Sequence, residues 1–135
     1  PASKADIPLD FGGRLAEEGC FVGSHAIVIL SDQDNIWQAA QNLMQFFAHE
    51  SCGQCTPCRS GTDKATELMA ASCPDTDLLD ELAATMADAS ICGLGQAAPN
   101  SLICAMQHFP QDIFKEDIGQ NESQVAKAKP SAKRT

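Results

Sequence analysis

Three cysteines spaced two residues apart form the most specific pattern in the sequence, Cys52-Gly53-Gln54-Cys55-Thr56-Pro57-Cys58. Cysteine thiolates are good ligands for soft metal ions and for iron-sulfur clusters. In a C-x2-C-x2-C loop each thiolate can reach a different iron of a cubane, while the fourth iron takes its ligand from elsewhere in the chain. We therefore expect these three cysteines to bind one four-iron four-sulfur cluster.

The fourth ligand must come from the other cysteines of the chain, which are Cys20, Cys73, Cys92 and Cys104. Cys92 lies in the irregular turn Ser90-Ile91-Cys92-Gly93-Leu94-Gly95, where the glycines let the backbone approach closely. This makes Cys92 the expected ligand. Two alternatives stay open: Cys73, which lies in a turn before a proline, and Cys20, which follows a glycine. Cys104 has the apolar neighbours of a buried helix residue, for which a free cysteine is an ordinary small hydrophobe.

Other uses of these cysteines need to be weighed against the cluster. A zinc ion held by four cysteines would staple the chain without a redox role, but zinc sites usually take separated C-x2-C pairs. An iron-sulfur sensor, whose fold changes when its cluster is lost, is a third possibility. A complete disulfide framework is disfavoured because the chain has seven cysteines, an odd number.

The cysteine loop is expected to join two helices. Before the loop, Ile36, Ala40, Leu43 and Phe47 recur at helical spacing, and after its second cysteine Thr56-Pro57 is typical of a helix start. Further helix starts are indicated at Asp75 or Thr76 and at Pro99, the last helix being stopped by Pro110. Four helices are thus predicted, over about 35–48, 56–71, 76–89 and 99–109.

The sequence divides into three parts. Residues 1–33 are expected to be an extended segment with one β-strand at His25–Leu30, and 34–118 to be the helical cluster domain. Residues 119–135 have few large apolar side chains and are expected to be a disordered basic tail. The predicted fold class is mainly α: a small four-helix bundle that carries an iron-sulfur cluster, with a short N-terminal extended or β segment.

The charge distribution excludes some partners. The net charge is −9, and up to residue 118 there are 17 acidic against 5 basic residues, so the body of the protein should repel phosphates and no nucleic-acid partner is expected. Apolar runs fall far short of the roughly 20 residues that span a bilayer, and the N-terminus lacks a signal-peptide pattern. We expect a cytoplasmic protein without membrane insertion.

With these motifs in hand, the chain resembles the C-terminal iron-sulfur region of the flavin-binding NADH dehydrogenase subunits. This family is shared by respiratory complex I, NAD-reducing hydrogenases and NAD-dependent formate dehydrogenases. Cys52 to Arg59 is similar to the family's cluster motif, and Ser90 to Gly95 to the segment that supplies its fourth ligand. Two further segments resemble the family. Gly23-Ser24 and the following strand are similar to the end of its small ubiquitin-like β domain. Phe46-Phe47 and Glu50-Ser51 are similar to the helix that enters the cluster loop.

The resemblance implies ligand roles for Cys52, Cys55, Cys58 and Cys92 and an electron-transfer function. It implies as partners a flavin- and NADH-binding subunit and other iron-sulfur subunits. FMN and NAD would lie only on a partner chain or a missing domain, because no glycine-rich flavin or nicotinamide site is found in residues 1–135, so the chain alone is not expected to oxidise NADH. Two features depart from the family pattern. His25 stands where relatives often have glycine, and the interval between Cys58 and Cys92 is shorter than in many relatives.

Overall fold

The computed structural model describes residues 2–18, 20, 22–23 and 27–114, and all regular structure in these residues is helical. The elements in chain order are η1 (Ala2–Lys4), α1 (Arg14–Glu17), α2 (Ile36–Glu50), α3 (Thr56–Met69), α4 (Thr76–Ala89), α5 (Gly93–Ala97), α6 (Asn100–His108) and η2 (Pro110–Asp112). Elements η1 and η2 are single 3-10 turns. None of the described helices has the length and apolar character needed to cross a membrane.

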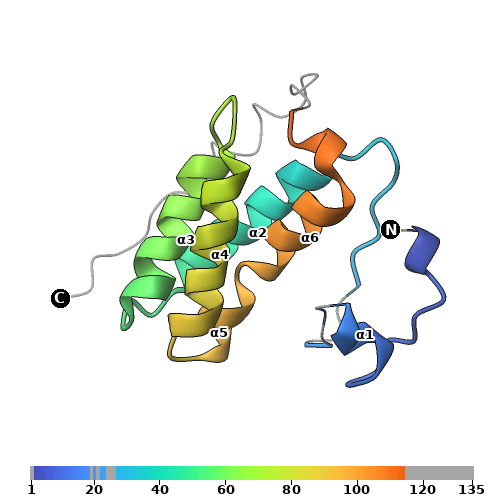
Figure 1. The fold of residues 1–135 in the computed structure, drawn as a ribbon, viewed down its shortest axis with the longest axis horizontal. Coiled ribbons are helices and arrows are strands. Elements are labelled where there is room, and N and C mark those ends of the chain that lie inside the picture. Colours follow the sequence, from blue (N-terminus) through green and yellow to red (C-terminus); the bar gives the residue numbers. More distant parts are fainter. Residues whose placement is uncertain (1, 19, 21, 24–26, 115–135) are drawn as a thin grey trace.

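Four of these helices form a bundle (Figure 1). Helix α2 packs against α3 and α6, and α4 packs against the same two helices, so the four surround one core. The largest fully buried apolar side chains of this core are Met44, Leu79, Met86 and Leu102. This confirms the predicted fold class, and the four predicted helices are found within two residues of their expected bounds.

Side-chain caps explain where two of the bundle helices begin. The Asn35 side chain accepts a hydrogen bond from the backbone N–H of Gln38 at 3.0 Å, and Asp75 accepts one from Leu78 at 3.1 Å. Such caps satisfy backbone donors that the first helical turn leaves without a partner. The start of α2 has a second acceptor, because Asp112 Oδ2 lies 3.0 Å from the N–H of Ile36, 76 residues earlier.

The short helix α5 was not predicted. Its sequence, Gly93 to Ala97, contains two glycines, which oppose helix formation, and was therefore expected to be an irregular turn. Backbone hydrogen bonds from Gln96 to Cys92 (3.2 Å) and from Ala98 to Leu94 (3.0 Å) close it. The Gln96 side chain donates a further bond to the carbonyl of Ser90 at 3.1 Å. These bonds give the turn a defined shape. Helix α5 also packs against α3 and α4, and this tertiary contact overrides its weak helix propensity.

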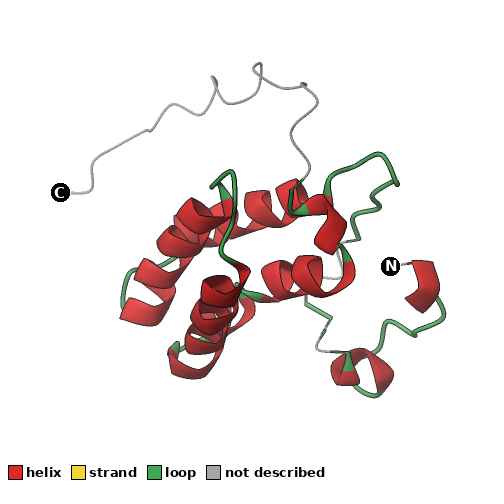
Figure 2. Ribbon diagram, turned by 45° about the horizontal axis from the view of Figure 1, so that its top comes forward, coloured by secondary structure: helices red, strands yellow, loops and turns green. Residues whose placement is uncertain are grey.

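The N-terminal segment also differs in part from the prediction. It lies beside the bundle and contains η1 and α1 (Figure 2). The strand expected at His25–Leu30 is not formed in its described part, residues 27–30, where Val28 and Ile29 are 80% and 90% exposed. A strand needs a hydrogen-bonded neighbour, and no other described segment pairs with this one. Residues 25–26 and the expected disordered tail lie outside the described residues.

Candidate metal centre

The two cysteine-bearing motifs meet at one end of the bundle. The loop between α2 and α3 carries Cys52 and Cys55, and the turn between α4 and α5 carries Cys92; both lie at the end marked by the α5 label in Figure 1. The loop between α3 and α4, with Cys73, lies at the opposite end. Because α3 has 14 residues, about 21 Å of helix separates the two ends. The fold therefore brings Cys92, and not Cys73, to the end that carries the cysteine loop.

The cysteine loop has a fixed backbone shape. Gly53 has φ of 76°, in the left-handed region that glycine adopts most easily, as expected for a backbone that turns around a cluster. Arg59 reaches back from α3, and its Nη1 donates a hydrogen bond to the Gly53 carbonyl at 3.0 Å. The N-cap of α3 is Cys55 rather than the expected Thr56, so the second cysteine stands at the helix start.

Cys58 is the most enclosed cysteine of the motif. It lies in the first turn of α3 and is 4% exposed, whereas Cys52 is exposed. The Cys58 Sγ is 3.4 Å from the Ser51 hydroxyl, which in turn accepts a hydrogen bond from the N–H of Gly53 at 3.3 Å. The thiol therefore belongs to a small polar network at the base of the loop.

The second motif packs directly against Cys58. A Cβ added to Gly95 would lie 2.8 Å from the Cβ of Cys58 and 2.5 Å from the Oγ of Ser90, closer than side chains normally approach. Only glycine allows the backbone of α5 to come this near to α3. Gly95 thus sets the distance between the two motifs.

Backbone N–H groups face the second cysteine of the loop. The pKa of the Cys55 thiol is held below its ordinary value, first by a hydrogen bond from the N–H of Ile91 and then by one from the N–H of Cys58. Ile91 belongs to the turn of the second motif, so this turn lies close to Cys55 of the first. The positive end of α3, where Cys55 is the N-cap, also favours a negatively charged group here. The Cys55 thiol therefore loses its proton more easily than an ordinary cysteine does.

These residues fit an iron-sulfur site. Cys55 and Cys58 are held together against the turn that carries Cys92, and Cys92 and Cys52 lie at the exposed rim. Among the described residues, no three histidine, cysteine or acidic side chains gather closely enough to hold a single metal ion. The groups that could bind a metal here are cysteine thiols, and backbone N–H groups and serine hydroxyls surround them. Iron-sulfur clusters are bound in such surroundings, and their potentials depend on these hydrogen-bond donors.

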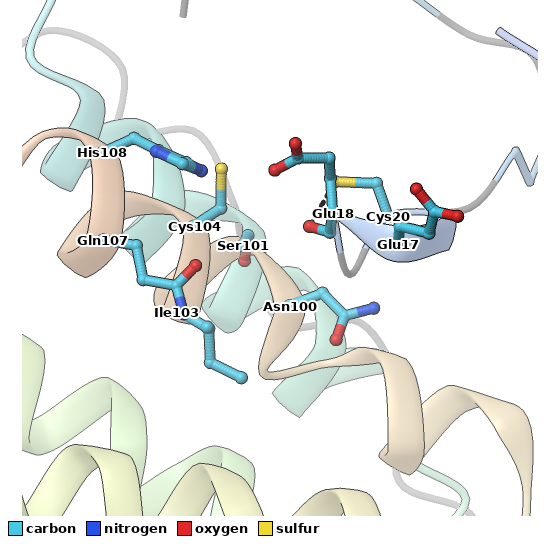
Figure 3. A pocket seen from close by; sticks show the side chains of 9 residues that line it. All are labelled: Glu17, Glu18, Cys20, Asn100, Ser101, Ile103, Cys104, Gln107 and His108. Carbon is cyan, nitrogen blue, oxygen red and sulfur yellow. Dashed lines mark hydrogen bonds between the residues drawn. The ribbon is translucent and has the colours of Figure 1, made fainter. Parts of the chain in front are cut away.

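Two of the remaining cysteines lie in a separate cavity of about 660 Å³ between α6 and the segment around α1 (Figure 3). Cys104 and Cys20 line it together with His108, Glu17 and other residues, none of which belongs to the cysteine loop or to the 90–95 turn. Burial raises the pKa of Cys104, and the neighbouring Cys20 raises it further. Cys104 is half-buried rather than enclosed in the core as expected.

Sequence reasoning missed two serines of the site. Ser51 and Ser90 each stand at the beginning of a cysteine motif. The Ser51 hydroxyl lies 3.4 Å from the Cys58 sulfur, and the Ser90 hydroxyl lies beside Gly95, which packs against Cys58. The Ser90 Oγ is buried and has no hydrogen-bond partner among the described residues. The signal in the sequence was a hydroxyl residue just before each cysteine segment.

Known proteins are similar to this chain over most of its length. Residues 38–116 match the family described as the NADH-ubiquinone oxidoreductase-F iron-sulfur binding region. Similar proteins include the F subunit of NADH-quinone oxidoreductase from Mycobacterium bovis, 34% identical over 81% of this chain and 26% of the relative. The F subunits of Streptomyces coelicolor and Aquifex aeolicus are 30% and 31% identical over 84% of this chain and 26% and 27% of the relative.

The chain spans about a quarter of the length of these relatives. The match includes all three cysteines of the loop and Cys92, and it begins in α2 and runs beyond η2. It confirms the resemblance that the two motifs indicate. The chain belongs to the NADH-ubiquinone oxidoreductase-F iron-sulfur binding region family.

Proposed function

We propose that the protein transfers electrons through one four-iron four-sulfur cluster held by Cys52, Cys55, Cys58 and Cys92. The observation that supports this best is the seating of the 90–95 turn against Cys55 and Cys58 at one end of the bundle. When bound, the cluster supplies a one-electron redox centre whose potential depends on its hydrogen bonds and exposure.

The chain's own residues have distinct roles in this proposal. Cys58 and Cys55 form the inner side of the site, and Cys52 and Cys92 its exposed rim. The N–H groups of Ile91 and Cys58 stabilise negative charge on the sulfur of Cys55. Arg59 and Gly53 hold the loop in place. A rim that lies near solvent at the end of the bundle is suited to exchange electrons with a partner that docks there.

The larger redox system is part of the proposal. The relatives are named as subunits of NADH-quinone oxidoreductase, and this chain corresponds to about a quarter of their length. We place the protein in an NAD(H)-linked oxidoreductase of complex I, hydrogenase or formate dehydrogenase type, between a flavin and further iron-sulfur clusters. FMN and NAD would be bound by a partner chain or by another domain.

The test is metal and sulfide analysis of anaerobically prepared protein, with electron paramagnetic resonance after dithionite reduction. We expect near four irons and four sulfides per chain and a reduced-cluster signal. Cys58→Ala and Cys92→Ala should each lose most of the iron, because each removes one ligand.

Two cysteines provide matched controls. Cys73→Ala alters the opposite end of the bundle and Cys104→Ala the separate cavity, so both variants should keep the iron content of the unmodified protein. Loss of iron in either variant would contradict the ligand set. Stoichiometric zinc without sulfide would favour a zinc-stapled structural module, and the proposed electron transfer would then be wrong.

A further inference from the structure

The hydroxyl of Ser90 is a buried polar group that lacks a hydrogen-bond partner in the described part of the chain. Ser90 is 5% exposed, and its Oγ makes no hydrogen bond to any described residue. Leaving a buried hydroxyl without a partner is unfavourable, and such groups are uncommon in native proteins. The backbone carbonyl of the same residue is satisfied, because it accepts a bond from Gln96. The side chain therefore requires a separate explanation.

The position of this hydroxyl points to Cys58. The Ser90 Oγ would lie 2.5 Å, and the Cys58 Cβ 2.8 Å, from a Cβ placed on Gly95, so both side chains pack against this glycine. Ser51 approaches the same cysteine, with its Oγ 3.4 Å from the sulfur. The hydroxyl of Ser51 thus contacts the most buried cysteine of the loop, and the hydroxyl of Ser90 borders the glycine that packs against this cysteine.

The chemistry of a ligating cysteine determines which group donates. A thiolate carries no proton, so a hydroxyl beside it can only donate. The Ser51 hydroxyl already accepts a bond from the N–H of Gly53, which leaves its proton available for Cys58. The Ser90 hydroxyl has no hydrogen-bond partner among the described residues, so its proton is also available.

We infer that Ser90 donates a hydrogen bond to the Cys58 thiolate when the cluster is bound, and that Ser90 and Ser51 together set the reduction potential. This inference rests on the proposed function. Reduction adds one electron and therefore negative charge at the ligated sulfurs. A donor that points at a sulfur stabilises the more negative state and raises the potential. The low exposure of Cys58 strengthens the effect, because hydrogen bonds are electrostatically stronger away from water.

The test is a potentiometric titration of the cluster-loaded full chain, followed by electron paramagnetic resonance. Ser90→Ala should shift the midpoint potential to a more negative value while iron and sulfide per chain stay unchanged. Ser51→Ala should shift the potential in the same direction. Ser101→Ala is the matched control, because Ser101 Oγ is also buried and without a partner among the described residues but lies on α6 beside the separate cavity. It should leave the potential unchanged.

A second pair of variants covers the case in which Ser90→Ala does not keep its cluster. Ser90→Thr and Ser90→Val crowd Gly95 equally and differ only in a hydroxyl against a methyl group, so the threonine variant should have the higher potential. Equal potentials in this pair, or an unchanged potential in iron-loaded Ser90→Ala, would overturn the inference while leaving the cluster itself in place. Absence of iron and sulfide in the unmodified protein would instead overturn the proposed function and this inference with it.

Discussion

At the scale of single residues, Gly53 gives the cysteine loop its turn. An alanine at φ of 76° is strained by roughly 1–2 kcal/mol, although its Cβ would meet only Arg59 Cδ at 3.9 Å. We expect Gly53→Ala to lose iron faster than the unmodified protein when both are exposed to a chelator, measured by the decay of visible absorbance. Gly12→Ala, in open space far from the loop in sequence, is the control. An equal rate of loss in Gly53→Ala would show that the loop tolerates another shape.

The thiols offer a prediction of pH dependence for the cluster-free protein. The pKa of Cys55 is lowered by backbone N–H groups, so its reactive thiolate persists to a lower pH than that of an ordinary cysteine. The pKa of Cys104 is raised by burial, so its thiolate appears only at a higher pH. We expect iodoacetamide to begin to alkylate Cys55 at a lower pH than Cys104. Mass spectrometry across a pH series measures the alkylation of each residue. The reverse order would contradict the hydrogen bond from Ile91.

At the scale of elements, α5 can lie close to α3 because Gly95 has no side chain. Gly95→Ala would place a Cβ within 2.8 Å of both Cys58 and Ser90, and it should push the 90–95 turn away from the cysteine loop. We expect lower iron content and a lower melting temperature. Gly93→Ala is a close control, because it lies in the same short helix and its added Cβ would meet nothing within 4 Å.

The Gly93 control also separates two explanations. Alanine favours a helix more than glycine does, so helix propensity alone would stabilise α5 in both variants. An equal loss of iron in both variants would show that the loss does not come from the contact with Cys58. A loss of iron confined to Gly95→Ala would show that the close approach matters. Iron analysis together with circular dichroism melting measures both properties.

The elements themselves were predictable where local chemistry determines them. Asp75 caps α4 by a bond to a residue three positions later, and Thr56-Pro57 starts α3, so sequence alone places both helices. The second acceptor at the start of α2 comes from Asp112, and no local pattern could indicate a partner 76 residues away. In the same way, the triple-cysteine loop and its Gly53 were predictable, whereas the contact of Gly95 with Cys58 was not.

The strand expected at His25–Leu30 illustrates a different limit. Its β-branched run has the composition of a strand, and residues 27–30 are nevertheless exposed and pair with no other described segment. Strand formation depends on a neighbouring strand, so composition alone does not ensure it. Helices satisfy their own backbone and could be predicted from one segment at a time.

At the scale of the whole molecule, the site lies where α2, α3, α4 and α5 end or begin. Metal binding that is coupled to a fold contributes to its stability. We expect the anaerobic, cluster-loaded protein to melt at a higher temperature than the chelator-treated protein in circular dichroism. Cys58→Ala, which lacks a ligand, should show no such difference under the same treatment. Equal melting temperatures with and without iron would show that the bundle is independent of the site.

The connection between Cys58 and Cys92 has a topological consequence. Both would attach to the same cluster, which then acts as a cross-link that closes a ring of 35 residues containing the α3–α4 hairpin. By loop-closure entropy, a cross-link of that span restricts the unfolded chain by on the order of 4 kcal/mol. Under the proposed function, oxidative damage to the cluster would therefore open the ring at the same moment as it ends electron transfer, and the whole bundle would lose the stabilisation that the closed ring gives it.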